Sequence, residues 1–223
     1  MAIWHVVKHV MPTLHITYFF DPLCGWCYGA APAVQKMAEH YPLTLVPTGV
    51  FFRSGRKLDA DFARYAWSND QRIERLTGQP FSLAYRQNIL QKNGDFDSEN
   101  CLLALTAVRQ AAPERELNVL AALQTARYVA GRDNTNLHVI GEVLQEQGLG
   151  DLIPLLTAQS TRSALMERIA NGQRLARQLG VQGVPHVVVQ AADGSRPAKA
   201  VPGSVLMGAT ANVAGAIRRI YSE

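Results

Sequence analysis

The chain has 223 residues, 48% hydrophobic and 18% charged, a composition typical of a folded globular protein and not of a disordered one. Its 22 Lys and Arg residues outnumber its 18 Asp and Glu residues slightly, so the formal charge is +4 and the pI is near 9.1. No run of five basic residues occurs, which argues against a nucleic-acid-binding protein. No apolar run reaches the ~18 residues of a membrane span.

Residues 1–13 are predicted to form a leader or an extra edge strand. His5, Lys8 and His9 interrupt this segment, so it lacks the continuous apolar stretch of a secretion signal, and no A-x-A cleavage site follows it. Cleavage a few residues later would also cut into the first predicted strand. These features favour a cytoplasmic protein.

The first strand is predicted over Ile16–Phe20, a β-branched and aromatic run that ends at Asp21-Pro22. Residues with helical apolar spacing continue to His40, so Cys24 is expected where that helix begins. The positive end of the helix dipole and the unpaired backbone N–H groups there favour thiolate over thiol. We therefore predict that Cys24 is a nucleophile.

Cys27 follows one turn further into the same helix, close enough to attack a mixed disulfide that Cys24 forms. We predict that it is the resolving thiol. Between the two cysteines, Gly25 permits a tight turn and Trp26 offers an apolar cover or docking surface beside the sulfurs. Neither residue is charged, and the lack of a histidine here indicates a less oxidising disulfide than the strongest oxidants have.

The same C-x-x-C pattern also occurs in zinc sites, which need a second pair of ligands. The chain offers only Cys101 and six scattered histidines, with no second C-x-x-C. A purely structural disulfide within C-x-x-C would close a very small loop and gain little stability from it. The sequence therefore favours a redox pair with no metal and no tightly bound cofactor, and Cys101, on an apolar helical stripe, is expected to be a core residue.

A second strand at Leu43–Val46 completes a right-handed βαβ unit with parallel strands. The loop Thr48–Lys57 should then border the cysteines, because parallel strands end at the same edge of a sheet. Arg53 is expected to supply a cationic rim for a substrate or glutathione, and Phe52 an apolar wall. Solvated loop charges with a buried phenylalanine are the alternative.

The rest of the chain is predicted to be a helical block followed by an αββα segment. Glycine and proline residues between apolar helical stretches divide the block into helices at 61–76, 82–90, 98–112, 114–130 and 136–147. A helix at 161–179, strands at 186–190 and 198–201 and a closing helix at 206–221 follow. The expected organisation is a thioredoxin-like domain of residues 14–57 and 160–223 that carries a helical insertion domain of residues 58–159.

The motif F-D-P-L-C-G-W-C-Y after a strand, the helical block and the later G-V-P together resemble the DsbA family of the thioredoxin superfamily, and within it the cytoplasmic DsbM-like branch. The resemblance implies an α/β thioredoxin fold, βαβ then ββα, with a large all-helical insertion. It also implies that Cys24 attacks, that Cys27 resolves and that Pro185 is cis and packs against the pair. Val184 would then offer its backbone N–H and C=O to an extended peptide or to glutathione.

The function expected from these features is thiol–disulfide oxidoreduction, as a reductase or isomerase coupled to glutathione. The substrate would be a disulfide-containing protein or a small thiol. The Gly-Trp dipeptide differs from the Pro-His of the exported oxidant, which argues against an oxidase. One rival is a glutathione-dependent transferase or isomerase of the kappa-class type, which typically has serine where Cys24 stands, and another is a binding module or chaperone with incidental cysteines.

Overall fold

The computed structural model describes residues 13–222, and within this range four strands form one mixed sheet in the order β2-β1-β3-β4. The strands are β1 Leu14–Phe20, β2 Leu43–Pro47, β3 His186–Ala191 and β4 Lys199–Ala200. β1 pairs in parallel with β2 and antiparallel with β3, and β4 pairs antiparallel with β3. This is the thioredoxin arrangement that the sequence predicts.

Helices occupy most of the remaining described chain. In order they are α1 Gly25–Ala38, α2 Ala60–Thr77, α3 Leu83–Asn88, α4 Glu99–Ala111, α5 Glu116–Tyr128, α6 Leu137–Glu146, α7 Gln159–Gln178, α8 Gly203–Leu206 and α9 Val213–Ser222. Short 3-10 segments lie at η1 Leu90–Lys92, η2 Pro113–Arg115, η3 Gly150–Thr157 and η4 Thr210–Asn212. Each of the five predicted helices of the insertion is present.

Local signals set the ends of the longest insertion helix. The side chain of Asp59 accepts a hydrogen bond from the backbone N–H of Phe62 at 2.8 Å and so caps the start of α2. Gly78 follows its last turn with φ of 74°, a left-handed conformation that glycine adopts without strain. The polar cap and the glycine therefore fix the length of the helix that packs against α1.

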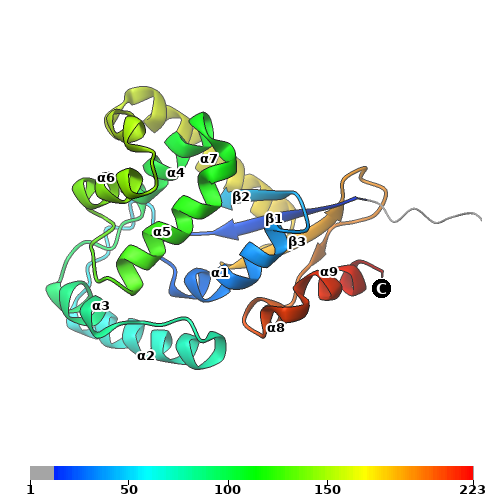
Figure 1. Ribbon diagram of the computed structural model, residues 1–223, viewed down its shortest axis with the longest axis horizontal. Helices are drawn as coiled ribbons and strands as arrows, with labels where there is room; N and C mark the ends of the chain where they lie inside the picture. Colours follow the sequence, from blue (N-terminus) through cyan, green and yellow to red (C-terminus); the bar gives the residue numbers. More distant parts are fainter. Residues whose placement is uncertain (1–12, 223) are drawn as a thin grey trace, which may run out of the picture.

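The sheet has helices on both faces (Figure 1). Side chains of a strand alternate between the two faces. Ile16 and Tyr18 of β1 belong to the main core with α1 and α9, whereas Phe19 packs with Ala176 of α7 on the opposite face. In the ribbon view the helices of the insertion lie mostly to the left of the sheet. α2 and α3 are at the bottom, and α4, α5 and α6 lie above them.

One continuous hydrophobic core joins the sheet to the insertion. It includes Ile16 of β1, Val34 of α1, Leu105 of α4 and Leu123 of α5, all fully buried. The insertion therefore packs directly against the helix that carries the cysteines. The division into domains of residues 14–57 with 160–223 and of residues 58–159 stays a prediction.

The structure corrects one predicted element and adds another. The closing helix predicted over 206–221 is interrupted, because Ala209 is extended, with φ of −61° and ψ of 129°, and α9 starts only at Val213. A side chain on Gly208 would meet the carbonyl of Ser204 at 2.6 Å, so this turn requires glycine. The added element is η3. The sequence does not indicate a helix there, because a proline lies within the segment.

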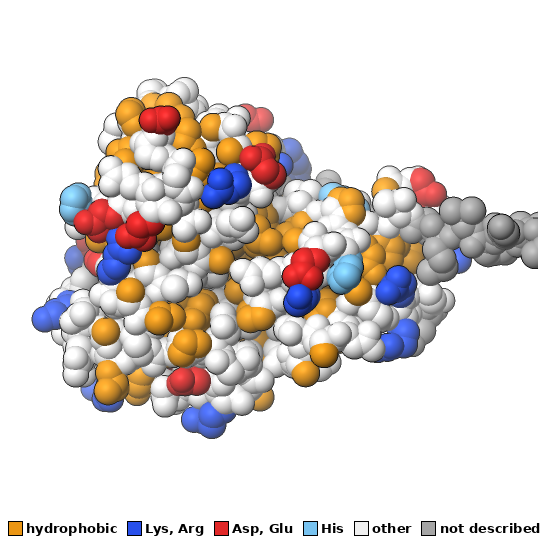
Figure 2. Space-filling view, viewed as in Figure 1, with side chains coloured by type: hydrophobic (Ala, Val, Ile, Leu, Met, Phe, Trp, Pro, Cys, Tyr) orange, Lys and Arg blue, Asp and Glu red, His pale blue; other side chains and the backbone are white. Residues whose placement is uncertain are grey.

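The predicted leader or edge strand, residues 1–13, lies outside the described residues apart from Thr13, whose carbonyl accepts a hydrogen bond from Ala192 at 2.8 Å. Basic and acidic side chains are interspersed over the face seen in Figure 2, with hydrophobic patches between them. Within the described part of the chain, no helix combines the length and apolarity that crossing a bilayer requires.

Candidate active site

Cys24 stands where the sequence predicts it, at the N-terminal end of α1. It is the N-cap residue, with φ of −80° and ψ of 115°, and its carbonyl accepts the first helical hydrogen bond, from Tyr28 N–H at 3.1 Å. Its own N–H donates to the carbonyl of Asp21 at 3.1 Å across the turn that ends β1. The side chain is 8% exposed. The first thiol thus lies at the positive end of the helix and is nearly buried.

Cys27 is fully buried. Burial, followed by the neighbouring Cys24, raises the pKa of the Cys27 thiol well above its ordinary value. All three cysteines of the chain are free thiols in this structure. The two cysteines of the motif therefore differ in exposure, since Cys24 keeps 8% of its surface exposed and Cys27 keeps none.

The backbone before Pro185 completes the site. The Val184–Pro185 peptide bond is cis, as the family resemblance implies. The Cys24 thiol lies 3.7 Å from the carbonyl oxygen of Val184, a contact between residues 160 positions apart. Val184 and Pro185 are partly exposed. Segments from the two ends of the thioredoxin fold thus meet at the first cysteine.

A buried carboxyl group holds the turn before the cysteines, a role that the sequence analysis missed. Asp21 accepts hydrogen bonds of 3.0 Å from the backbone N–H of Leu23, the backbone N–H of Phe51 and the hydroxyl of Ser98. Burial raises the pKa of Asp21 to about 6, while these three donors oppose the rise. The carboxyl group links the cysteine turn to the loop after β2 and to the start of α4.

The insertion also contacts the cysteine motif directly. Tyr128 of α5 donates a hydrogen bond from its hydroxyl to the carbonyl of Leu23 at 2.8 Å, and its side chain is buried. A Cβ placed on Gly25 would lie 2.6 Å from Oδ1 of Asp70 on α2, so the glycine leaves room for a carboxyl group. The helical block therefore shapes the active-site turn.

Trp26, the other residue between the cysteines, is half-buried. The guanidinium of Arg72 on α2 lies 5.6 Å from the centre of the indole ring, a cation–π contact. Trp26 packs against the hydrophobic core, and its role as an apolar docking surface beside the sulfurs stays a prediction.

The structure places Phe52 and Arg53 against the insertion. Arg53 donates two hydrogen bonds, of 3.1 and 2.7 Å, to the carboxylate of Glu99 on α4. Phe52 packs against a small cluster that includes Leu102 and Ile169. No contact joins either side chain to the cysteines within the described residues. Their role in binding substrate or glutathione stays a prediction.

The third cysteine has a different environment. Cys101 is fully buried on α4, and its thiol donates to the carbonyl of Asn134 at 2.9 Å. Burial raises the pKa of this thiol strongly, with Arg127 opposing the rise. The prediction that Cys101 is a core residue is confirmed.

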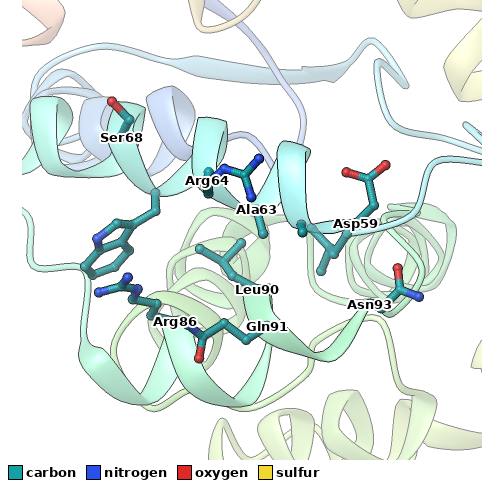
Figure 3. Close-up of a pocket in the computed structure, with 11 residues that line it drawn as sticks. Asp59, Ala63, Arg64, Ser68, Arg86, Leu90, Gln91 and Asn93 are labelled. Atoms are coloured by element: carbon teal, nitrogen blue, oxygen red, sulfur yellow. The ribbon is translucent and has the colours of Figure 1, made fainter.

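One pocket lies away from the cysteines. It measures about 650 Å³ and separates α2 from α3 and η1. Figure 3 shows Ala63, Arg64 and Ser68 on one wall and Arg86, Leu90 and Gln91 on the other. The guanidinium of Arg86 stacks on the ring of Trp67 at 5.1 Å. None of the residues that line this pocket belongs to the cysteine motif or to the segment around Pro185.

Comparison with known proteins agrees with this geometry. A family model for the DSBA-like thioredoxin domain matches residues 15–212. The chain belongs to that family, and its fold is the one on which the family carries out thiol–disulfide oxidoreduction. Comparison with curated protein sequences gives no match.

Two structures of the cytosolic disulfide reductase DsbM from Pseudomonas aeruginosa are similar to this chain at 27% identity. The first has a TM-score of 0.83 and covers 93% of this chain and 98% of DsbM. The second, determined with GSH, has a TM-score of 0.82 and covers 94% of this chain and all of DsbM. A putative protein disulfide isomerase from Nitrosomonas europaea shares the fold at 21% identity and a TM-score of 0.72, over 94% of this chain and 96% of its own.

Proposed function

We propose that this protein is a cytoplasmic disulfide reductase that draws its electrons from glutathione, with Cys24 as the attacking thiol and Cys27 as the resolving thiol. The contact of the Cys24 thiol with the Val184 carbonyl, with Cys27 buried behind it, is the observation that carries the proposal. Similarity to cytosolic DsbM, including its structure with GSH, supports the compartment, the direction and the donor.

The reaction begins when the thiolate of Cys24 attacks one sulfur of a substrate disulfide. A bond forms between Cys24 and that sulfur, the substrate disulfide breaks, and the other substrate sulfur leaves as a thiolate that takes up a proton. Cys27 then loses its proton and attacks the sulfur of Cys24. The second substrate thiol leaves. The substrate disulfide has then been reduced by two electrons, and the protein has been oxidised to the Cys24–Cys27 disulfide.

Glutathione restores the dithiol in two steps. One glutathione thiolate attacks the Cys24–Cys27 disulfide and forms a mixed disulfide with Cys24, and a second glutathione displaces the first as glutathione disulfide. The mild basicity of the chain, with a formal charge of +4, suits an anionic tripeptide. In a reducing compartment the excess of glutathione drives the cycle towards reduction of the substrate.

The substrate is proposed to lie in an extended conformation beside Val184 and Pro185, with Trp26 as an apolar surface. The pairing of Phe19 in β1 with His186 in β3, which puts Pro185 near the end of β1 that precedes the cysteines, supports this placement. The backbone of the partly exposed Val184 can pair with a peptide or with glutathione as an added strand does. Isomerase activity would use the same mixed disulfide.

Insulin reduction with a glutathione-regenerating system tests the proposal. The wild type is expected to reduce insulin, Cys24→Ser to have no turnover, and Cys27→Ser to accumulate a mixed disulfide with the substrate. Cys101→Ser is the matched control, because this buried thiol lies outside the motif. Full turnover by Cys27→Ser with a protein substrate and no added thiol would contradict the two-cysteine mechanism, because glutathione could otherwise replace Cys27.

The same assay separates the rival functions. A chaperone would suppress insulin aggregation as well in Cys24→Ser as in the wild type. A glutathione transferase or isomerase of the kappa-class type would consume glutathione with small electrophiles and would not need Cys27. Dependence of insulin reduction on both cysteines is the result that the proposal requires.

A further inference from the structure

The pocket between α2 and the α3–η1 segment has the size and lining of a small-molecule site (Figure 3). Its volume of about 650 Å³ lies within the ~300–1,000 Å³ of typical ligand pockets. The buried side chains of Leu58 and Leu90 close it on the inside, and the half-buried Ala63 and Trp67 form apolar walls. Most of the other lining residues are polar and exposed, so the pocket opens to solvent.

The polar groups of the pocket are divided between two ends. Figure 3 shows Asp59 and Asn93 at one end and Arg86 at the other, with Leu90 between them. The carboxylate of Asp59 faces the start of α2, where it accepts the hydrogen bond from the N–H of Phe62. The pocket therefore has a polarity: an anionic group is repelled by Asp59 and attracted by Arg86.

Arg86 is placed to bind an anion. Its guanidinium lies 5.1 Å from the centre of the Trp67 ring and forms no ion pair within residues 13–222. Arg64, the other arginine of the pocket, is in contrast paired with Asp61. A guanidinium packs well on an aromatic face, and its planar fork presents two parallel N–H groups to a carboxylate.

We propose that this pocket binds a small carboxylic acid with an apolar body. The carboxylate accepts two hydrogen bonds from the guanidinium of Arg86, and the apolar body lies between Trp67 and Ala63 above Leu90. The site goes beyond disulfide reduction, because it contains none of the groups that take part in that reaction. Binding there is non-covalent and exchanges neither protons nor electrons with the cysteines.

The apolar body and the charge of the ligand both contribute to binding. Contact with the apolar walls stabilises the complex in proportion to the apolar area removed from water. The carboxylate adds charge-assisted hydrogen bonds, which are roughly twice as strong as neutral ones. An amide of the same shape loses the charge, and acetate loses the apolar body, so each is expected to bind more weakly than the complete acid.

NMR spectroscopy of the isotope-labelled full chain locates and measures the binding. The indole N–H signal of Trp67, assigned by its absence in Trp67→Phe, should shift saturably on titration with phenylbutyrate, while the indole signal of Trp26 stays in place. Phenylbutyramide, the uncharged amide of the same acid, is expected to bind about tenfold or more weakly, as the loss of a hydrogen bond to a charged group predicts. Acetate should give no saturable shift.

Three variants make the result specific. Arg86→Gln is expected to weaken phenylbutyrate binding about tenfold or more and to leave phenylbutyramide binding nearly unchanged. Arg75→Gln is the matched control, because this exposed arginine of α2 does not line the pocket. Ala63→Leu keeps a good helix former in α2 and places a larger side chain in the pocket, so it should weaken the binding of both compounds.

Several results would overturn the proposal. They are the absence of a saturable Trp67 shift at millimolar phenylbutyrate, equal affinity for the acid and its amide, and undiminished binding by Arg86→Gln. A shift confined to Trp26 would place the ligand at the cysteine motif and would overturn it as well.

The site and the reductase mechanism can be tested separately. Cys24→Ser, which is expected to lack reductase turnover, should bind phenylbutyrate as the wild type does. Arg86→Gln should reduce insulin as the wild type does in the absence of the acid. Failure of the proposed reductase function therefore leaves the pocket assignment in place, and loss of the pocket assignment leaves the reductase function in place.

Discussion

Replacing Asp70 by Asn is expected to stabilise the protein at neutral pH, although Asp70 contacts the active-site motif. The carboxyl group is 4% exposed, and it lies where a side chain on Gly25 would otherwise be. Burial raises the pKa of Asp70 from 3.8 to about 7, while the hydroxyl of Tyr85, which donates to Oδ2 at 3.1 Å, and the charge of Arg127 oppose the rise. The folded state thus disfavours the ionised carboxylate.

The size of the effect follows from the two pKa values. An unfolded Asp titrates near 3.8, so above this pH the unfolded chain releases a proton that the folded protein still holds, and stability falls until the pH passes about 7. The cost reaches about 2 kcal/mol at pH 5 and about 4 kcal/mol at pH 7.5, at 1.36 kcal/mol per pH unit. Asn has the same shape and no charge, so the advantage of Asp70→Asn should grow by about 2 kcal/mol over this range.

Urea unfolding at pH 5 and pH 7.5, followed by tryptophan fluorescence, measures this difference. Asp21, whose pKa is also raised, makes the free energy of unfolding depend on pH as well. This contribution cancels in the comparison, because the wild type and Asp70→Asn both contain Asp21. Tyr85→Phe is the matched control: it removes the hydrogen bond that favours the carboxylate, so it should steepen the fall of stability with pH. A difference between wild type and Asp70→Asn that is the same at both pH values, or an Asn variant that is less stable at neutral pH, would refute the reasoning.

Other substitutions test the contacts around the site. Tyr128→Phe leaves the carbonyl before Cys24 without its donor and should lower the free energy of unfolding by about 1–3 kcal/mol in urea titrations; an unchanged value would contradict the bond. Gly172→Ala on α7 brings a Cβ to 2.4 Å from the carbonyl of Pro47, so a loss of about 1–3 kcal/mol is expected in thermal unfolding, against no loss for Gly203→Ala, which has open space. In the native reduced protein, iodoacetamide should modify Cys24 first and leave Cys101 intact, as peptide mass mapping would show. Equal labelling of both would contradict the burial.

The position of the first cysteine could be predicted because its determinants are local. A β-branched run, an Asp-Pro stop and helical spacing in the next residues define a strand, a turn and a helix start without reference to the rest of the chain. The contact of Pro185 with the cysteine pair follows only from the resemblance to a family, since nothing close to Pro185 in the sequence indicates its partner. The cis bond and the contact with Val184 agree with that expectation.

The groups that support the cysteines could not be predicted, because their partners are far away in the sequence. The sequence predicts only that Asp21 ends a strand, yet one of its donors is Ser98, 77 residues later. The parallel strands predict that the loop with Arg53 borders the cysteines, because they fix the edge of the sheet, but they do not predict the direction of each side chain. Glu99, a residue of the insertion, binds that guanidinium. Helical spacing predicts that α4 exists but does not specify what it contacts.

The reduction potential of the Cys24–Cys27 couple tests the central claim most directly. The protein is equilibrated in glutathione buffers of graded ratio, free thiols are trapped by alkylation, and the dithiol and disulfide forms are counted by mass spectrometry. One two-electron transition is expected, with a midpoint well below the about −120 mV of the strong oxidant DsbA. A pair that never closes into a disulfide, or a midpoint at or above that value, would contradict a glutathione-driven reductase.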